Sequence, residues 1–429
     1  MRSRRAPHSG RLPAAVLALA VLGGAAGCSE GAPRPAPLKT APLPAGERLA
    51  PGVVYQEFTA RGPAGPVRAH LVRIAPDARA RLATAHGRTL AAAGTVRDAA
   101  RRAGALAAVN ASYFDIRGGK GFAGYPGDPT GLYVERGTVL SESRNDAAAL
   151  LLGTEDGRPT ARIARVATAG RLTADDGASR ELDGVDRVAG RLRPCGGPDA
   201  ERRVAAGRPL TRDARSGLCE DPDEIVEFTP EWGTGLPDGA DGSVATVLAA
   251  DGTVRGLREP ATGSMPRGSR VLYGIGAGAD WLRAHARPGS RVTASTTLRD
   301  LDGAPVPGRV ESAVGGGARL LKGGELALGE RDLGRPDRPA RTVVGITGDG
   351  SVLLLVLDGR DPGVSAGATL AEAAELLRSL GAVDGLNLDG GGSSTMVVGG
   401  ALRNRPRESK GDPVSEREVA TVLAVVPEP

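Results

Sequence analysis

The alternation of apolar and polar residues is clearest at Leu386-Asn387-Leu388-Asp389. Successive side chains of a strand point to opposite faces of a sheet, so this pattern predicts a half-buried strand. The two leucines then face a core, and Asn387 and Asp389 share the other face. Three glycines follow, and glycine tolerates backbone angles and close approaches that a Cβ forbids. We therefore predict a strand that ends in a glycine-rich turn carrying an amide and a carboxylate.

Two further strands and a helix are predicted just before this stretch. Residues 341–347 and 351–357 read as apolar strands joined by a hairpin turn. A capping-box pattern at Thr369 and Glu372 then opens an amphipathic helix that ends near Gly381. The helix joins the strand of residues 351–357 to the strand that ends at Asp389.

This order of elements predicts that two carboxylates lie close together. A strand, a helix and a second strand usually form a right-handed crossover with the two strands parallel. Parallel strands present their carboxyl ends at one edge, where open α/β sheets bind ligands. Because Asp358 and Asp389 each follow such a strand, we expect them to share this rim.

The N-terminal half is also rich in predicted strands. Residues 53–82 predict two or three strands, 95–103 a short capped helix, and 105–109 a buried strand that leads into Asn110. Short strands and turns follow over 139–310, and 64 glycines and 32 prolines among 429 residues favour many turns. We therefore expect an α+β (mixed α/β) fold: a strand-rich single large catalytic domain with a mixed sheet and few helices.

The N-terminus has the pattern of an export signal. Residues 1–27 combine a basic start, a short apolar run and small residues, and the run is too short for a comfortable membrane span. The last residues before Cys28 resemble a bacterial lipoprotein cleavage box, so we expect a lipidated Cys28 on the outer face of the cell membrane, with simple secretion as the alternative. Residues 28–52 predict a Pro/Ala-rich tether. Residues 53–104 would then pack on a catalytic domain over 105–427.

Charge and cysteine content narrow the partners. The signal contains Arg2, Arg4, Arg5 and Arg11, and removing these four charges from the net charge of +5 leaves +1. A nucleic-acid partner is therefore not indicated. In an oxidising compartment we expect Cys195 and Cys219 to form a structural disulfide. The chain has only four histidines, which disfavours a zinc site or a His-based triad.

The glycine-rich turn is also a candidate anion site. Successive N–H groups in such a turn can form an anion-binding nest, and the hydroxyls of Ser393 and Ser394 follow directly. The alternative is an ordinary tight turn in which Asp389 is only a local acceptor. Aromatic residues gather between Tyr113 and Tyr133, where they could stack on a sugar or simply fill a core.

Four motifs follow one another along the chain: Ala107–Asn110 with Phe114-Asp115, Gly315–Leu321, Arg341–Ile346 and Leu386–Thr395. They resemble signatures of the phosphodiester glycosidase family, the family of the "uncovering enzyme" domain. The resemblance runs from about Ala105 to Val426 and suggests an exported bacterial member. Glu416-Arg417, before the final strand, also resembles the family's closing motif. One departure is Ala111-Ser112-Tyr113, where the family tends to have Gly-Gly-Phe.

The resemblance implies a hydrolase that cleaves the bond between a sugar's anomeric carbon and a phosphodiester, on a glycan of the cell envelope or outside the cell. Asp389 would stabilise or attack an oxocarbenium-like state, and Asp358 would act as a base or orienter. Donors to the leaving phosphate would be Arg341, the amides of Gly390, Gly391 and Gly392, and the hydroxyls of Ser393 and Ser394. Further catalytic candidates are Asn110, Asp115 and Glu311, and further substrate-binding candidates are Gly316, Asn387 and Thr395. Arg319 is a rival to Arg341.

Other functions stay open at this point. A phosphodiesterase that cleaves the P–O bond would use a similar set of donors, usually with a metal. No cofactor is required by the sequence, although scattered acids could assemble a divalent-cation site. A serine hydrolase using Ser393 or Ser394 would need a nearby base, which the few histidines disfavour. A lipid-anchored polysaccharide-binding protein without turnover is the non-enzymatic alternative.

Overall fold

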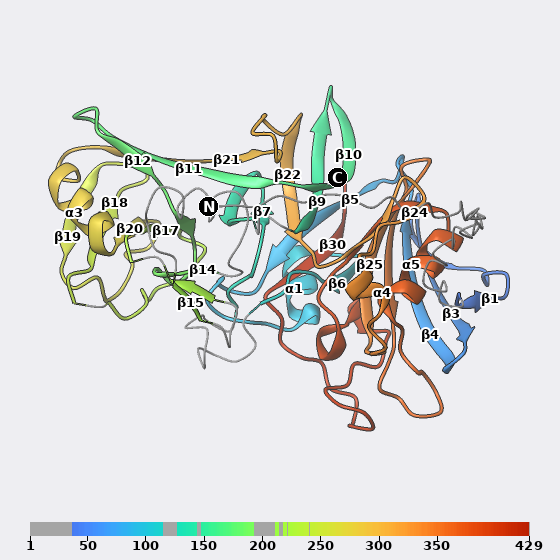
Figure 1. Cartoon of the computed structure of the whole chain (residues 1–429). Helices are drawn as coiled ribbons and strands as arrows, with labels where there is room; N and C mark the ends of the chain where they lie inside the picture. Colours follow the sequence, from blue (N-terminus) through green and yellow to red (C-terminus); the bar gives the residue numbers. More distant parts are fainter. Residues whose placement is uncertain are drawn as a thin grey trace, which may run out of the picture. The chain divides into compact units, whose positions relative to one another are not determined.

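The structure is a computed structural model that describes residues 37–114, 127–143, 147–192, 211–213, 218–220, 222–239 and 241–428. Antiparallel β-sheets dominate it, with a few short helices packed on them (Figure 1). Among the described residues, the only parallel pairing of named strands joins β13 (Gly184–Val185) and β17 (Ile225–Phe228). The expectation of a mixed α/β fold is therefore wrong. No helix in the described ranges is long and apolar enough to span a membrane.

The largest sheet contains the strand that leads into the glycine-rich turn. Its path is β1-β3-β4-β26-β25-β27-β23-β24, and β2 pairs with β3. The strands are β1 (Lys39–Thr40), β2 (Glu47–Ala50), β3 (Val53–Gly62), β4 (Gly65–Ile74), β23 (Arg319–Lys322), β24 (Glu325–Leu326), β25 (Arg341–Thr347), β26 (Val352–Leu357) and β27 (Ala382–Asn387).

The predicted hairpin and helix are present, and α5 joins two strands of the same direction as expected, but these strands are not neighbours in the sheet. β25 and β26 pair antiparallel across the turn, and Thr369 and Glu372 form a capping box at the start of α5 (Leu370–Ser379). The helix returns the chain past β25, which pairs antiparallel with both β26 and β27. β26 and β27 thus run in the same direction without pairing, because a strand already present fills the position between them.

Both faces of this sheet are buried, which explains its continuous apolar strands. Leu353, Leu355 and Leu357 of β26 pack in one cluster with Leu376 and Leu377 of α5. The alternate side chains of β26 enter a second core, which continues into the neighbouring sheets. A strand that is covered on both faces has no polar face, so its sequence does not alternate.

A second sheet faces this core. Its order is β29-β28-β6-β30-β5, and α1 (Val96–Ala103) packs on its other side in a separate cluster. The strands are β5 (Ala80–His86), β6 (Ala107–Asn110), β28 (Met396–Val398), β29 (Ala401–Leu402) and β30 (Thr421–Pro427). As predicted, Thr95 caps α1, and Gly104 ends it with a φ of 63°.

The middle of the chain forms the remaining sheets. The ribbon of β11 and β21 links the sheet that carries α3 (Gly276–His285) with the strands around β9 and β22 (Figure 1). The strands and short helix are β7 (Tyr133–Glu135), β8 (Thr138–Ser141), β9 (Ala148–Glu155), β10 (Arg158–Arg165), β11 (Ala167–Ala174), β12 (Ser179–Glu181), β14 (Arg191–Leu192), β15 (Thr211–Asp213), β16 (Leu218–Glu220), β18 (Val244–Leu248), β19 (Val254–Arg258), β20 (Arg270–Gly274), β21 (Val292–Arg299), β22 (Arg309–Gly315) and α4 (Glu330–Leu333).

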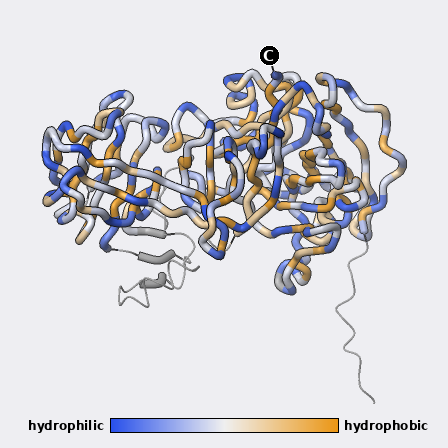
Figure 2. Tube along the Cα trace, turned by 90° about the horizontal axis from the view of Figure 1, so that it is seen from above, coloured by the Kyte–Doolittle hydropathy of each residue, from blue (hydrophilic) through white to orange (hydrophobic). Residues whose placement is uncertain are grey.

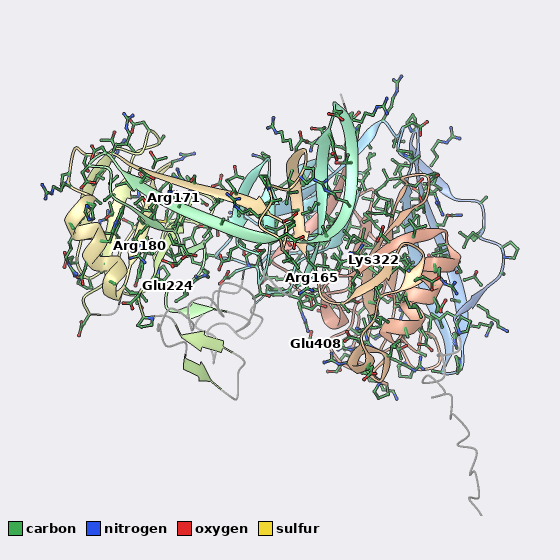
Figure 3. The ribbon with its side chains drawn as sticks, turned by 45° about the horizontal axis from the view of Figure 1, so that its top comes forward. Arg165, Arg171, Arg180, Glu224, Lys322 and Glu408 are labelled. Carbon is green, nitrogen blue, oxygen red and sulfur yellow. The ribbon has the colours of Figure 1, made fainter. Side chains whose placement is uncertain are left out.

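Hydrophobic residues concentrate inside the packed strands, and hydrophilic residues mark many of the turns (Figure 2). A buried ion pair is an exception to this separation. Arg187 donates two hydrogen bonds to Glu224, at 2.9 and 2.7 Å, and Glu224 (labelled in Figure 3) is fully buried. Its neighbouring acids raise the pKa of Arg187, so the pair stays charged although it is removed from water.

The segment predicted to be a tether is partly folded. Residues 28–36 lie outside the described ranges, but β1 and β2 pair with β3, and Leu38 is buried against the largest sheet. The prediction of a tether up to residue 52 is therefore wrong. The proline content suggested an extended linker, but backbone hydrogen bonds to β3 fix residues of this segment as strands β1 and β2.

Candidate active site

The backbone of Asp389, two residues after the end of β27, is hydrogen-bonded through both its N–H and its carbonyl. Its N–H donates to the carbonyl of Ala111 at 3.0 Å, and its carbonyl accepts from Asn110 Nδ2 at 2.7 Å. Asn110 is completely buried at the end of β6, and its Oδ1 accepts from Thr342 Oγ1 and from the Thr395 N–H. Asn110 thereby ties both ends of the glycine-rich turn to β25. These contacts favour a positioning role for Asn110, and its predicted catalytic role stays a prediction.

The carboxylate of Asp389 lies in a poorly hydrated but polar setting. Its Oδ1 accepts from the Gly390 N–H at 2.9 Å, and its carboxylate also hydrogen-bonds Ser393. Burial raises the pKa of Asp389 from 3.8 to about 6, although the bonds from Ser393 and Gly390 and the charge of Arg417 oppose this rise. A carboxylate with such a pKa is ionised at neutral pH and still basic enough to accept a proton.

Most backbone N–H groups of the three glycines in the turn donate hydrogen bonds within the protein. Gly391 has a φ of +66° within the short 3₁₀ turn Gly391–Ser393, and its N–H donates to the Ala340 carbonyl at 2.8 Å. The Gly390 N–H is taken by Asp389. Two of the three amides expected to cradle a phosphate are therefore already engaged within the protein.

Two arginines border the turn instead. Arg417 Nη1 donates to Ser393 Oγ at 3.1 Å, and the rest of its guanidinium pairs with Glu408, which is labelled in Figure 3. A Cβ on Gly392 would lie 2.5 Å from both Arg417 Nη2 and Glu408 Oε2, so only glycine leaves room for this pair. Arg360 approaches Gly391 in the same way, with a notional Cβ 3.0 Å from its Nη2.

Arg360 keeps unused donors. Its Nη1 donates to the carbonyls of Arg407 and Glu408, and its Nε and Nη2 have no hydrogen-bond partner among the described residues. Its backbone is strained, with a φ of 60° that non-glycine residues rarely adopt. Such strain is often found at functional sites. The sequence analysis missed Arg360 as a site residue and left Arg417 only as part of a closing motif, because neither arginine adjoins the turn in sequence.

Asp358 belongs to a buried network beside the turn. It is 1% exposed, and its Oδ1 accepts from the Arg405 N–H at 3.0 Å and from Asn404 Nδ2 at 3.2 Å. Its Oδ2 lies 3.5 Å from His70 Nε2, and His70 Nδ1 is 2.9 Å from the Tyr55 hydroxyl. Burial opposes ionisation, but His70 and these donors outweigh it and lower the pKa of Asp358.

Asn404 links this network to the turn. Besides its bond to Asp358, its Nδ2 donates to the Ser394 carbonyl at 2.8 Å, and its Oδ1 accepts from the Met396 N–H at 2.7 Å. Asp358 therefore supports the far end of the turn through Asn404. Its burial and this link favour the predicted role of Asp358 as an orienter over its role as a base.

Three buried polar atoms around the turn have no protein partner among the described residues. They are Asn387 Oδ1, Ser394 Oγ and Thr395 Oγ1. Asn387 Nδ2 donates to the Tyr113 hydroxyl at 2.7 Å and to the Leu388 carbonyl at 2.8 Å. Buried polar atoms usually have partners, so these atoms indicate that water or a ligand completes their hydrogen bonding.

The other predicted phosphate-binding residues have mainly structural contacts. Arg341 is buried, donates through Nε to the Ala368 carbonyl at 2.9 Å, and lies near Asp337; burial lowers its pKa. Arg319 pairs with Asp384 on β27 at 2.6 Å, and its Nε donates to the Leu321 carbonyl. Gly316 lets a loop pass over Leu386, because a Cβ there would lie 2.6 Å from that side chain.

Glu311 does not belong to this site. It lines a separate pocket together with Arg309, on β22. Asp115, Cys28 and Cys195 lie outside the described residues, and of Cys219 only its backbone position on β16 is described. The predicted disulfide and lipidation remain predictions. Within the described ranges, no group of three or more His, Cys, Asp or Glu residues could hold a metal ion.

The sequence of this region matches a known family. Residues 242–426 match the family model described as phosphodiester glycosidase, and this range includes Asp358, Asp389, Arg360 and Arg417. N-acetylglucosamine-1-phosphodiester alpha-N-acetylglucosaminidase of Mus musculus is 40% identical over 88 residues, which are 20% of this chain and 17% of that protein. The human protein of the same name is 38% identical over 88 residues. The chain thus aligns with about one sixth of the length of these relatives.

Solved structures share the fold over most of the chain. A Burkholderia pseudomallei protein proposed to be exported is 30% identical, with a TM-score of 0.70 over 84% of this chain and 74% of that chain. A hypothetical protein from Synechocystis is 18% identical, with a TM-score of 0.62 over 87% of this chain and 62% of that chain, and it supports the fold alone. Residues 242–426, which are less than half of the chain, are thus similar to the phosphodiester glycosidase family.

Proposed function

We propose that this chain is a hydrolase that cleaves the C1–O bond of a sugar-1-phosphodiester. One observation carries the proposal: the charge of Arg417 acts on the Asp389 carboxylate, and Arg360 borders the same turn at Gly391, all within the family's matched range. A carboxylate suits the positive charge that develops at the anomeric carbon, and guanidinium groups suit the phosphate that leaves. The similarity to glycosidases that act on N-acetylglucosamine-1-phosphodiesters supports the same reaction class.

The reaction needs little acid assistance. As the C1–O bond breaks, its electron pair stays on the phosphate oxygen, and the free N–H groups of Arg360 stabilise the resulting phosphate monoester. Water adds its oxygen to C1 and gives one proton to Asp389, whose pKa of about 6 allows it to accept that proton and release it to solvent. The products are a free sugar and a phosphate monoester.

Ser393 couples the two sides of this arrangement. It hydrogen-bonds Asp389 and accepts from Arg417, so it fixes the distance between the carboxylate and the guanidinium. The unpartnered Asn387 Oδ1 and Ser394 Oγ supply additional polar contacts close to the turn. A substrate that bridges these groups would have a polar sugar on one side and an anion on the other.

The substrate is proposed to lie outside the cytoplasm. The export signal over residues 1–27 and the similarity to a protein proposed to be exported support this location. A lipidated Cys28 would hold the enzyme at the outer face of the cell membrane, where envelope glycans carry phosphodiesters. Intact-mass analysis of the mature protein tests this part, because a chain that begins at Met1 without a lipid would contradict it.

The position of an oxygen label distinguishes the proposed reaction from its rivals. The enzyme is incubated with a sugar-1-phosphodiester in oxygen-18 water, and the phosphate monoester is analysed by mass spectrometry. We expect an unlabelled phosphate monoester, because the water oxygen goes to the sugar. A labelled phosphate monoester would show P–O cleavage, and no turnover across a panel of such diesters would favour a binding protein.

A further inference from the structure

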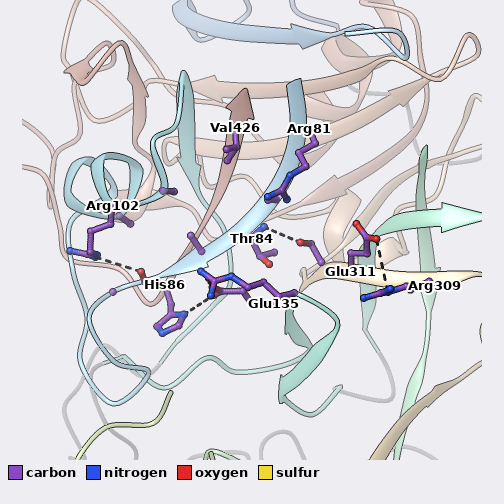
Figure 4. A pocket seen from close by; sticks show the side chains of 15 residues that line it. Arg81, Thr84, His86, Arg102, Glu135, Arg309, Glu311 and Val426 are labelled. Atoms are coloured by element: carbon purple, nitrogen blue, oxygen red, sulfur yellow. Dashed lines mark hydrogen bonds and ion pairs between the residues drawn. The ribbon is translucent and has the colours of Figure 1, made fainter. Parts of the chain in front are cut away.

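A second polar pocket lies away from the glycine-rich turn, along β5 at the edge of its sheet. Its volume is about 460 Å³, and side chains from β5, α1, β22 and the β7–β8 hairpin line it (Figure 4). The lining includes four arginines from separate parts of the chain: Arg81, Arg102, Arg136 and Arg309. A pocket of this volume is within the range that holds small ligands.

The acids of the pocket contact only two of these arginines: Arg136 Nη2 lies 3.5 Å from Glu135 Oε1, and Arg309 Nε lies 4.0 Å from Glu311 Oε1. Four arginines and two glutamates, Glu135 and Glu311, leave a charge of +2 (4 − 2). Glu135 is already satisfied, because its Oε2 accepts from the Tyr133 hydroxyl at 2.5 Å and lies 2.7 Å from His86 Nδ1. Burial opposes ionisation of Glu135, but His86 and Tyr133 outweigh it and lower its pKa, so it remains an anion.

The rim arginines keep donors for a ligand. Arg102 makes one long bond of 3.5 Å to the His86 carbonyl, and Arg81 has no hydrogen-bond or ion-pair partner among the described residues. Arg309 lies 4.0 Å from Glu311, which is a weak contact. Figure 4 shows Arg81, Arg102 and Arg309 around the pocket, with the His86–Glu135 pair between them.

We propose that this pocket binds the phosphate of a phosphorylated glycan. The pocket carries a net positive charge, its Arg81 and Arg102 side chains have no acid partner among the described residues, and guanidinium forks match phosphate oxygens. The choice of phosphate rests on the proposed function, since a chain that cleaves sugar phosphodiesters would meet several phosphates along one polymer. A second phosphate-binding site would then bind a polymeric substrate while the site at Asp389 cleaves one of its bonds.

Calorimetric titration of the full chain with inorganic phosphate and with glucose 1-phosphate tests the pocket directly. We expect two binding events, one lost in Arg417→Ala and the other weakened about tenfold or more in Arg81→Ala and in Arg102→Ala. Arg255→Ala is the matched control, because Arg255 is an exposed arginine on β19 outside both sites. Circular dichroism confirms that each variant is folded.

Turnover separates this inference from the proposed function. We expect Arg81→Ala and Arg102→Ala to raise KM for a polymeric phosphodiester severalfold and to leave turnover of a small sugar-1-phosphodiester unchanged. Phosphate binding that is insensitive to Arg81 and Arg102, or as sensitive to Arg255, would overturn the inference and leave the proposed function intact. Binding at the pocket in a chain that cleaves no sugar-1-phosphodiester would overturn the proposed function alone.

Discussion

At the scale of single residues, Asp389 and Asp358 show how environment gives two carboxylates different roles. Burial dominates around Asp389 and raises its pKa to about 6, whereas the donors around Asp358 keep its pKa low. The first acid can exchange a proton near neutral pH, and the second is a permanent anion that organises its neighbours. The sequence placed both at strand ends but could not assign these roles, because the donors to Asp358 come from residues 70 and 404–405.

Asp389→Asn tests the role of the charge. The variant keeps the size of the side chain but removes the charge that meets the oxocarbenium-like state. Loss of such stabilisation costs about 3–4 kcal/mol, so we expect turnover to fall at least a hundredfold. In the wild type, kcat/KM should fall about tenfold per pH unit below about pH 6, where Asp389 becomes protonated. Near-normal turnover of a folded Asp389→Asn protein would remove Asp389 from the mechanism.

The same substitution should not destabilise the fold at neutral pH. Because the pKa of Asp389 rises from 3.8 to about 6 on folding, the folded state retains a proton between these values that the unfolded chain has lost. This contribution to stability is present below about pH 4 and is lost as the pH rises through 6, at a cost of about 3 kcal/mol. Thermal unfolding at pH 7 should therefore show Asp389→Asn to be at least as stable as the wild type. A marked loss of stability with turnover preserved would support the ordinary-turn alternative.

Asp358→Asn should behave in the opposite way. The amide removes the negative charge that faces His70 and weakens the hydrogen bonds that Asp358 accepts from Arg405 and Asn404. We therefore expect the free energy of unfolding to fall by about 2–4 kcal/mol. Since the pKa of Asp358 is lowered on folding, its contribution is present at neutral pH and is lost as the pH falls through the folded pKa. Urea unfolding at pH 7 and at acid pH measures both effects. A stable variant with a hundredfold loss of turnover would instead place Asp358 in the chemistry.

At the scale of elements, the sequence correctly predicted the features that depend on residues close together in the chain. The β25–β26 hairpin and the caps of α1 and α5 depend on turn and capping residues a few positions apart, and all three are present. The connection from β26 through α5 to β27 joins two strands of the same direction as predicted, but the sequence did not show that β25 lies between them. The arginines at the glycine-rich turn were missed because folding, not sequence proximity, brings residues 360 and 417 to it.

Gly392→Ala tests how closely the turn and Arg417 fit. The added methyl would lie 2.5 Å from Arg417 Nη2 and Glu408 Oε2, so the guanidinium must move away from Ser393. Both groups are ends of flexible side chains, so we expect stability to change by less than about 1 kcal/mol. Turnover should fall roughly tenfold or more, because a catalytic donor is displaced.

The matched control is Gly256→Ala on β19, where a Cβ meets nothing within 4 Å. Steady-state kinetics and thermal melting of both variants give the comparison. Equal turnover in the two variants would mean that the position of Arg417 does not matter for the reaction.

At the scale of the whole molecule, the two ends of the chain share sheets. β4 pairs with β26 along six residue pairs, and β5 pairs with β30 along seven. The boundary that the sequence suggested between residues 104 and 105 therefore does not separate sheets. The sequence does not reveal such pairings, because β4 and β26 lie more than 250 residues apart and many strands of the chain are similarly apolar.

A fragment that begins at Ala105 should not fold, although it holds every described residue of the glycine-rich turn. Without β4, the fully buried strand β26 would become an exposed apolar edge, which favours aggregation. His70 would also be missing from Asp358, and β30 would lose its partner β5. We expect residues 105–429 to be insoluble or to lack a cooperative melt, whereas residues 37–429 should melt cooperatively. Expression of both fragments with circular dichroism and turnover assays gives the test, and an active 105–429 fragment would show that β3, β4 and β5 are dispensable.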